Sequence, residues 1–266
     1  MRQSLTWRFA TTMLIPLLRI ALKLRMEGRE NIAQDHPQII ACNHTSHIDP
    51  VIAGYSAGLE TAFLAKEEVF RASRFLGWLI RKYHSYPVNR GAGDVAALRK
   101  CSELLRQNRT LILFPEGTRS KPGNLQPLRP GVAMLAIMNN VPIVPAFISG
   151  VRRSFVPWIV DPDIIRYERE RRTSTDEHGR TQTEGSLRFR LASLWDSSVR
   201  IFFGRPLRPD GFQRSKDDYR RLTEQLYHAL LELEQRFALA PQLRLQEKMG
   251  HPSKQGCPHP EGDDYA

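Results

Sequence analysis

The chain has 266 residues, 41% of them hydrophobic, which is ordinary for a globular protein with one large core. Lysine and arginine number 39 against 28 for aspartate and glutamate, and this formal net charge of +11 predicts an acidic partner, such as an anionic membrane surface or an acidic carrier protein. Nucleic acid is disfavoured as a partner, because the sequence has no zinc-finger spacing, no G-K-[ST] phosphate loop and no aromatic-basic repeat.

Residues 1–30 are predicted to associate with a membrane surface. Through residue 25, apolar and basic residues recur at helical spacing on two faces: Trp7, Ala10, Met13, Leu14, Leu17, Ala21 and Leu24 against Arg8, Arg19 and Lys23. The uninterrupted apolar run, residues 13–18, is far shorter than the roughly 20 residues of a spanning helix, and no signal-peptidase site follows it. The pattern favours an amphipathic helix in the headgroup plane, with a first helix packed on the core as the alternative.

A short apolar run and a polar loop come next. Gln38 to Cys42 is typical of a buried strand of a parallel sheet. Asp49 is predicted to cap a helix that has Pro50 at its first helical position and continues to about Leu59. The loop between them would lie at the carboxyl end of a strand, where open α/β sheets bind ligands. His44 and Asp49 are therefore a candidate catalytic pair, in which the carboxylate orients the imidazole. The alternative is that Asp49 only caps the helix and His44 only bonds to backbone.

A second apolar run, Leu111 to Phe114, also leads into a loop of functional residue types, Pro115 to Ser120. In that loop Gly117 would allow a close backbone approach, and Arg119 carries a planar donor fork that matches phosphate. A third polar turn supplies the guanidinium of Arg90. Since the ends of parallel strands meet at one edge of a sheet, these loops predict a base beside a phosphate-binding group.

The remaining apolar runs predict an α/β fold in which a mostly parallel central sheet is flanked by helices. Further strands are expected at residues 61–65, 83–88, 141–149 and 199–203, and further helices at 94–108, 132–138 and from Ser215 onward. These elements place one domain at residues 31–240. Within it, residues 166–195 are charged and poor in apolar anchors, which predicts a mobile insertion, and residues 241–266 are predicted to be a disordered tail.

Four motifs in this order resemble those of the glycerolipid acyltransferase family, whose best-known bacterial members are 1-acyl-glycerol-3-phosphate acyltransferases. They are N-H-x-x-x-x-D at Asn43–Asp49, V-N-R at Val88–Arg90, F-P-E-G-T-R-S at Phe114–Ser120 and V-P-I-V-P at Val141–Pro145. Together they span roughly residues 38 to 150. The chain departs from the family pattern at Asn89, where aspartate is frequent, and near His84, where glycine is common, and both departures bear on the identity of the acceptor.

The resemblance implies that His44 is a general base and that Asp49 orients it. It also implies an acceptor-phosphate site, whose members are Arg90, Glu116, Gly117, Thr118 and Arg119. Within this site Glu116 is expected to orient Arg119 or the acceptor hydroxyls, because a carboxylate and a phosphate would repel each other. The implied reaction moves an acyl group from acyl-CoA or acyl carrier protein to lysophosphatidate and forms phosphatidate, with no cofactor and no metal. Glycerol 3-phosphate, other lysophospholipids and lyso-aminolipids remain alternative acceptors. The basic amphipathic N-terminal segment, and cysteines that suit a reducing cytosol, predict a location at the cytoplasmic face of a membrane, as a peripheral or monotopic protein.

Other classes of function are weaker predictions. A metallohydrolase built on His44, His47 and Asp49 would lack the final histidine of the usual H-x-H-x-D-H loop. The cysteines, Cys42, Cys101 and Cys257, are too far apart in sequence to suggest a disulfide framework or a metal site built from clustered cysteines. A serine hydrolase is disfavoured because no G-x-S-x-G elbow is present. A non-catalytic membrane-binding protein would leave the polar loops at the strand ends unexplained.

Overall fold

The computed structural model describes residues 15–67, 85–88, 94–119, 125–151 and 198–249, together with Thr12, Phe70 and Arg81. Several sequence predictions therefore lie outside the described residues. They are most of the N-terminal helix before residue 15, the phosphate-site candidate Arg90, the insertion at residues 166–195, and the tail beyond residue 249.

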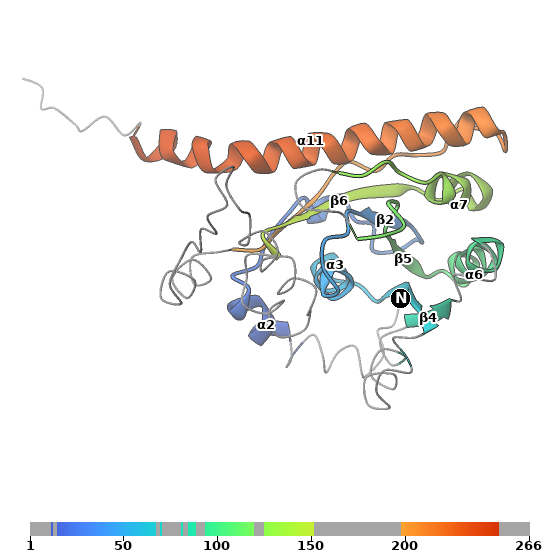
Figure 1. Ribbon diagram of the computed structural model, residues 1–266, viewed down its shortest axis with the longest axis horizontal. Coiled ribbons are helices and arrows are strands. Elements are labelled where there is room, and N and C mark those ends of the chain that lie inside the picture. Colours follow the sequence, from blue (N-terminus) through green and yellow to red (C-terminus); the bar gives the residue numbers. More distant parts are fainter. Residues whose placement is uncertain are drawn as a thin grey trace, which may run out of the picture.

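A seven-stranded sheet in the order β1-β7-β6-β2-β5-β3-β4 forms the centre of the molecule (Figure 1). The strands are β1 Arg25–Glu27, β2 Ile39–Cys42, β3 Thr61–Lys66, β4 Ser85–Val88, β5 Thr110–Leu113, β6 Ile143–Ser149 and β7 Arg200–Phe203. From β6 to β4 every neighbouring pair is parallel, whereas β7 is antiparallel to β6 and β1 is parallel to β7. The predicted mostly parallel α/β sheet is confirmed.

Helices cover both faces of this sheet. They are α2 Ile15–Ala21, the short 3-10 helix η2 Arg29–Asn31, α3 Asp49–Ala57, α6 Asp94–Arg106, α7 Gly131–Asn139 and α11 Lys216–Met249. On β2, Ile40 packs in one buried cluster with Ile52 of α3, while Ile39 packs in another with Leu104 of α6 and Leu222 of α11. Because both faces of β2 are buried, the strand is apolar without alternation. Figure 1 shows α11 lying along one side of the molecule and α3 on the other side of the sheet.

Strand β2 lies between β5 and β6, and the three strands run in the same direction. Ile39 of β2 pairs with Leu111 of β5 on one side and with Ile143 of β6 on the other. The loops that follow Cys42 and Leu113 consequently leave the sheet side by side, at its carboxyl edge. This register brings the first and third sequence motifs together.

The N-terminal segment differs from its prediction. The helix predicted through residue 25 ends at Ala21, and Leu24, predicted on the apolar membrane-facing side, is buried in the core. The chain turns at Lys23, which has φ 45°, and then forms β1 against β7. A strand of three residues gives too short a periodic signal for sequence analysis, so β1 was not predicted. The predicted membrane segment of residues 1–30 therefore overlaps the sheet.

The last helix begins as predicted and continues further. The Ser215 hydroxyl accepts a hydrogen bond from the Asp218 amide at 3.1 Å, while the Asp218 carboxylate accepts one from the Gln213 amide at 2.9 Å. Its buried face consists of Leu222, Leu226, Leu230 and Leu233. The helix ends at Met249, so the tail predicted from residue 241 would begin within α11. Among the described residues, no helix is both long and apolar enough to cross a membrane.

Candidate active site

Asn43, the first residue after β2, joins that strand to β6. Its side-chain amide donates to the Ile148 carbonyl at 3.0 Å, and its side-chain oxygen accepts from the Ile148 amide at 2.7 Å. These bonds extend the contact between the two strands beyond the end of β2, so the backbone entering the next residue is fixed. Sequence analysis assigned no role to Asn43, because its partner lies 105 residues away in the chain.

His44 and Asp49 are in contact, as predicted for a catalytic pair. The His44 Nδ1 atom lies 3.1 Å from Asp49 Oδ2, and the exposed fractions of the two side chains are 17% and 0%. With Nδ1 donating its hydrogen to the carboxylate, Nε2 carries the lone pair that can accept a proton. The ring also stacks on Phe114, at 4.2 Å between centroids and an interplanar angle of 26°. The carboxylate and the aromatic ring together fix the orientation of the imidazole.

The predicted N-cap at Asp49 is wrong. The N-cap residue is Ile48, with no side-chain cap bond, and Asp49 stands at the first helical position beside Pro50. The carboxylate instead turns back to the loop, where Oδ2 accepts hydrogen bonds from the amides of Thr45 at 2.5 Å and Ser46 at 2.7 Å. Asp49 therefore holds the loop around His44 as well as the imidazole itself. The helix also ends earlier than predicted, at Ala57.

Glu116 connects the two motif loops. Its side chain is buried, with 5% exposed, and its Oε1 atom accepts a hydrogen bond from the backbone amide of His44 at 2.9 Å. The Oε2 atom accepts a second bond from the backbone amide of Gln126, also at 2.9 Å. One carboxylate thus contacts the base-bearing loop and the segment that leads into α7.

The side chain of Arg129 lies close to Gly117, the residue at which the sequence predicted a close backbone approach. The φ of 72° at Gly117 favours glycine, and a Cβ atom there would lie 2.7 Å from Arg129 Nε. Arg129 is exposed, and its own amide donates to the Pro115 carbonyl at 2.8 Å. Sequence analysis missed Arg129, although a basic residue directly before the Pro130-Gly131 helix start was a usable signal.

The rest of the predicted site is in the same loop or outside the described residues. Thr118 is exposed and Arg119 is half-buried, and both directly follow Gly117. Arg90 is not described, but β4, the strand that precedes it, ends at Val88 and is parallel to β3. The structure therefore brings His44, Asp49, Glu116 and Gly117 together.

Two other features near the loop bear on the chemistry. Burial, with the negative charges of Asp49 and Glu116, raises the pKa of the Cys42 thiol well above its usual value, so this cysteine stays protonated and is a poor nucleophile. His47 is exposed. Across the described part of the chain, no group of three or more histidine, cysteine, aspartate or glutamate side chains is arranged to hold a metal ion.

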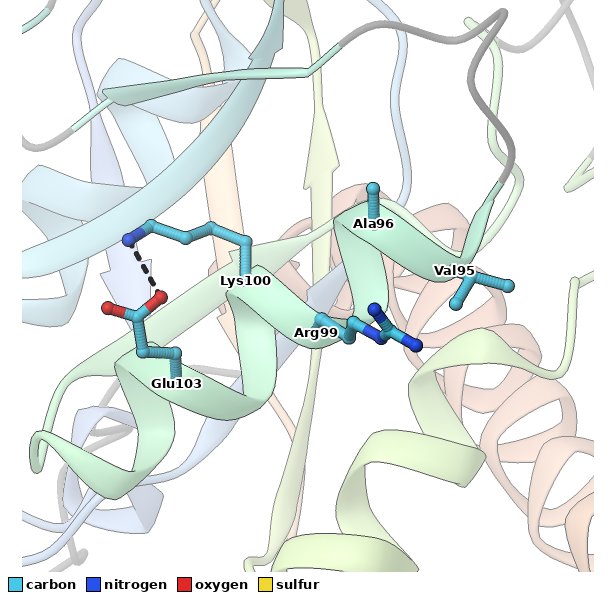
Figure 2. Close-up of a pocket in the computed structure, with 5 residues that line it drawn as sticks. All are labelled: Val95, Ala96, Arg99, Lys100 and Glu103. Atoms are coloured by element: carbon cyan, nitrogen blue, oxygen red, sulfur yellow. Dashed lines mark hydrogen bonds and ion pairs between the residues drawn. The ribbon is translucent and has the colours of Figure 1, made fainter.

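A shallow recess on the outer side of α6 lies apart from these residues (Figure 2). It is lined by Val95, Ala96, Arg99, Lys100 and Glu103. None of these side chains belongs to the predicted site.

Several known proteins are similar to this chain in sequence. Residues 23–149 match the family model described as "Acyltransferase". Over 145 residues, covering 54% of this chain and 71% of the relative, the sequence is 27% identical to the 1-acyl-sn-glycerol-3-phosphate acyltransferase of Bacillus subtilis. It is 32% identical over 157 residues to the lyso-ornithine lipid O-acyltransferase of Pseudomonas aeruginosa, covering 57% of this chain and 60% of that protein.

A solved structure is also similar. The 1-acyl-sn-glycerophosphate acyltransferase PlsC of Thermotoga maritima superimposes with a TM-score of 0.56 and 26% sequence identity, over 90% of this chain and 84% of that one. The chain spans less than half the length of the chloroplast relatives that it matches, for example 38% of the 1-acyl-sn-glycerol-3-phosphate acyltransferase of Brassica napus.

Proposed function

Because this chain is similar in sequence and in structure to glycerolipid acyltransferases, we propose that it transfers a fatty acyl group from a thioester to the free hydroxyl of 1-acyl-glycerol-3-phosphate, forming phosphatidate. The observation that carries the proposal is the contact of 3.1 Å between His44 Nδ1 and the buried Asp49 carboxylate, at the carboxyl edge of the sheet.

The proposed base is His44. Its Nε2 atom removes the proton from the acceptor hydroxyl while the hydroxyl oxygen forms a bond to the thioester carbonyl carbon. The tetrahedral intermediate then collapses, the carbon–sulfur bond breaks, and the departing thiolate takes the proton back from the imidazolium. Asp49 stabilises that imidazolium and keeps Nε2 free to accept the proton. Thiolate is a good leaving group, so the transfer requires no covalent intermediate on the enzyme.

The proposed acceptor site is the set of cationic and polar groups beside the base. Arg119 and Thr118 follow Gly117 in the loop after β5, Arg129 packs over Gly117, and Arg90 stands two residues after the end of β4 in the sequence. Guanidinium groups bind phosphate through paired charged hydrogen bonds. Holding the phosphate would place the acceptor hydroxyl against His44 and make the reaction effectively unimolecular.

We propose the cytoplasmic face of a membrane as the site of action, with acyl-CoA or acyl carrier protein as donor. The excess of basic residues suits an anionic lipid surface and an acidic carrier. At the end of α2, Arg19 and Ile20 are exposed, Ile20 to 76%, which supports contact of this helix with lipid.

The test is detection of phosphatidate by mass spectrometry after the purified protein is mixed with lysophosphatidate and each donor in turn. We expect product from the wild type and a loss of ~10² to 10⁴-fold in the His44→Ala variant, the usual contribution of a general base. His47→Ala is the matched control, because His47 lies in the same loop with its side chain exposed. A loss in His47→Ala equal to that in His44→Ala would contradict the assignment of the base.

A second acceptor is supported by one comparison, the similarity to the lyso-ornithine lipid O-acyltransferase. The same assay therefore includes lyso-ornithine lipid as a parallel acceptor. Acylation of that lipid with no phosphatidate formed would keep the proposed chemistry and replace the proposed acceptor.

A further inference from the structure

We infer that Glu116 is a positioning residue that sets the location of the base His44 relative to the phosphate-binding side chains, and that it does not itself bind the acceptor phosphate. This inference deepens the proposed function and rests on His44 being the base. It reassigns Glu116 from the acceptor-phosphate site in which its motif placed it.

The first argument is the pair of bonds that the carboxylate makes. Oε1 accepts from the His44 amide and Oε2 from the Gln126 amide, both at 2.9 Å, and the side chain is 5% exposed. Both bonds are partly buried, where water replaces a lost acceptor poorly, so the carboxylate is the partner that joins two otherwise separate loops. A phosphate placed against the same oxygens would meet like charge in a poorly solvated site.

The second argument is where these bonds lead. The His44 amide belongs to the residue that carries the imidazole, so its position sets the position of the base. The Gln126 segment continues to Arg129, whose amide bonds to the Pro115 carbonyl and whose side chain packs over Gly117. Glu116 thus joins the base on one side to a guanidinium on the other. A fixed spacing between base and phosphate site is what holds an acceptor hydroxyl in attack geometry.

The third argument explains why the residue must be glutamate. Both oxygens accept hydrogen bonds from N–H donors, and a glutamine has one accepting oxygen and one donating NH₂ group. In Glu116→Gln an NH₂ group would therefore face one of the two backbone amides, whichever way the side chain is turned. An aspartate keeps both acceptors but is one methylene shorter and cannot reach both amides from the same backbone position.

The experiment combines hydrogen–deuterium exchange with steady-state kinetics on the full chain, comparing wild type, Glu116→Gln and Glu116→Asp. We expect faster exchange in peptides that cover residues 43–49 and 125–130. We also expect kcat to fall by ~10 to 10²-fold, the effect of misplacing a reacting group by about 1 Å, with KM for lysophosphatidate changed by less than about threefold. Glu103→Gln is the matched control, because Glu103 is an exposed carboxylate that also accepts hydrogen bonds. It should change neither exchange in these peptides nor kcat.

A rise in KM for lysophosphatidate with kcat and exchange unchanged would overturn the inference, because this is the signature of a lost ground-state contact with the phosphate. Exchange at residues 43–49 equal to that of the wild type in both variants would also overturn it. If the wild type makes no phosphatidate, the proposed acceptor is wrong, and the exchange experiment still decides whether Glu116 holds the two loops.

Discussion

The carboxylates of this protein occupy two contrasting environments. At the carboxyl edge of the sheet, Asp49 and Glu116 are almost fully buried, and each accepts hydrogen bonds from backbone amides of a loop. On the outer side of α6, the Glu103 side chain is 53% exposed and accepts hydrogen bonds from Lys100 and Gln107 of the same helix (Figure 2). Glu116 connects segments that are distant in the chain, and Asp49 holds the short loop that precedes its helix, whereas Glu103 connects neighbouring turns of one helix.

This difference indicates where function should depend on a single charge. The Lys100 hydrogen bond and charge lower the pKa of Glu103, but water solvates the pair and screens their attraction. Removing Glu103 would release the polar ends of Lys100 and Gln107, which water can solvate. Removing either buried carboxylate would instead leave backbone amides unsatisfied in the interior, beside the proposed base.

The largest effect is expected for Asp49→Asn. The variant keeps the volume of the side chain but removes the negative charge beside His44 Nδ1, which stabilises the imidazolium that forms during proton transfer. We therefore expect kcat to fall ~10² to 10⁴-fold. Initial rates of phosphatidate formation at saturating substrate measure this. If kcat falls less in Asp49→Asn than in Glu103→Gln, activity does not depend more on the buried carboxylate than on the exposed one, and the contrast between the two environments is wrong.

An intermediate effect is expected where Arg129 packs on Gly117. In Gly117→Ala the new Cβ would lie 2.7 Å from Arg129 Nε, so the guanidinium must move, and alanine is also strained at φ 72°. We expect KM for lysophosphatidate to rise about tenfold in Gly117→Ala and in Arg129→Ala, the loss of roughly 1.4 kcal/mol of binding free energy. The double variant should show little further rise, because the two residues act through one contact.

The matched control for this cycle is Arg208→Ala. Arg208 is an exposed arginine that follows β7, an antiparallel strand that ends at the opposite edge of the sheet. If the losses of binding free energy in Gly117→Ala and Arg129→Ala add fully in the double variant, the two residues act independently. That result would contradict the inference that Arg129 serves the acceptor site through its packing on Gly117.

The smallest effect concerns the buried side of α6. Burial raises the pKa of Cys101 from 9.0 to about 12. A thiol whose pKa is higher in the folded state contributes stability that is complete below the unfolded pKa and is lost as pH rises toward the folded value. By pH 10 the unfolded thiol is mostly ionised, so the wild type should lose about 1.4 kcal/mol of unfolding free energy from this group.

Urea unfolding at pH 8 and pH 10 measures this loss, with Cys101→Ala as the comparison. The variant should lose less free energy over the same pH interval, by about 1.4 kcal/mol. Glu103→Gln, which changes the exposed side of the same helix, should show the pH dependence of the wild type. An identical pH dependence in Cys101→Ala would show that the thiol ionises equally in both states.

The sequence alone determined the local features of this protein. Gln38 to Cys42 and Leu111 to Phe114 were predicted as buried strands because each is a short apolar run that ends at polar residues, and the structure has β2 and β5 there. The contact between His44 and Asp49 was also predictable, since only a tight loop separates them in the chain. Ser215 was recognised as a helix start because its capping partner stands three residues on.

Only the tertiary structure decided how distant segments meet. Glu116 and His44 are 72 residues apart, and Asn43 and Ile148 are 105 apart, so no local pattern could show that their side chains and backbones are hydrogen-bonded. The three-residue strand β1 forms because its backbone pairs with β7. Asp49 does not cap its helix as predicted, because its carboxylate accepts hydrogen bonds from backbone amides of the preceding loop. Sequence patterns report what a residue can do beside its neighbours, whereas the roles of buried polar groups depend on which donors the fold brings within reach.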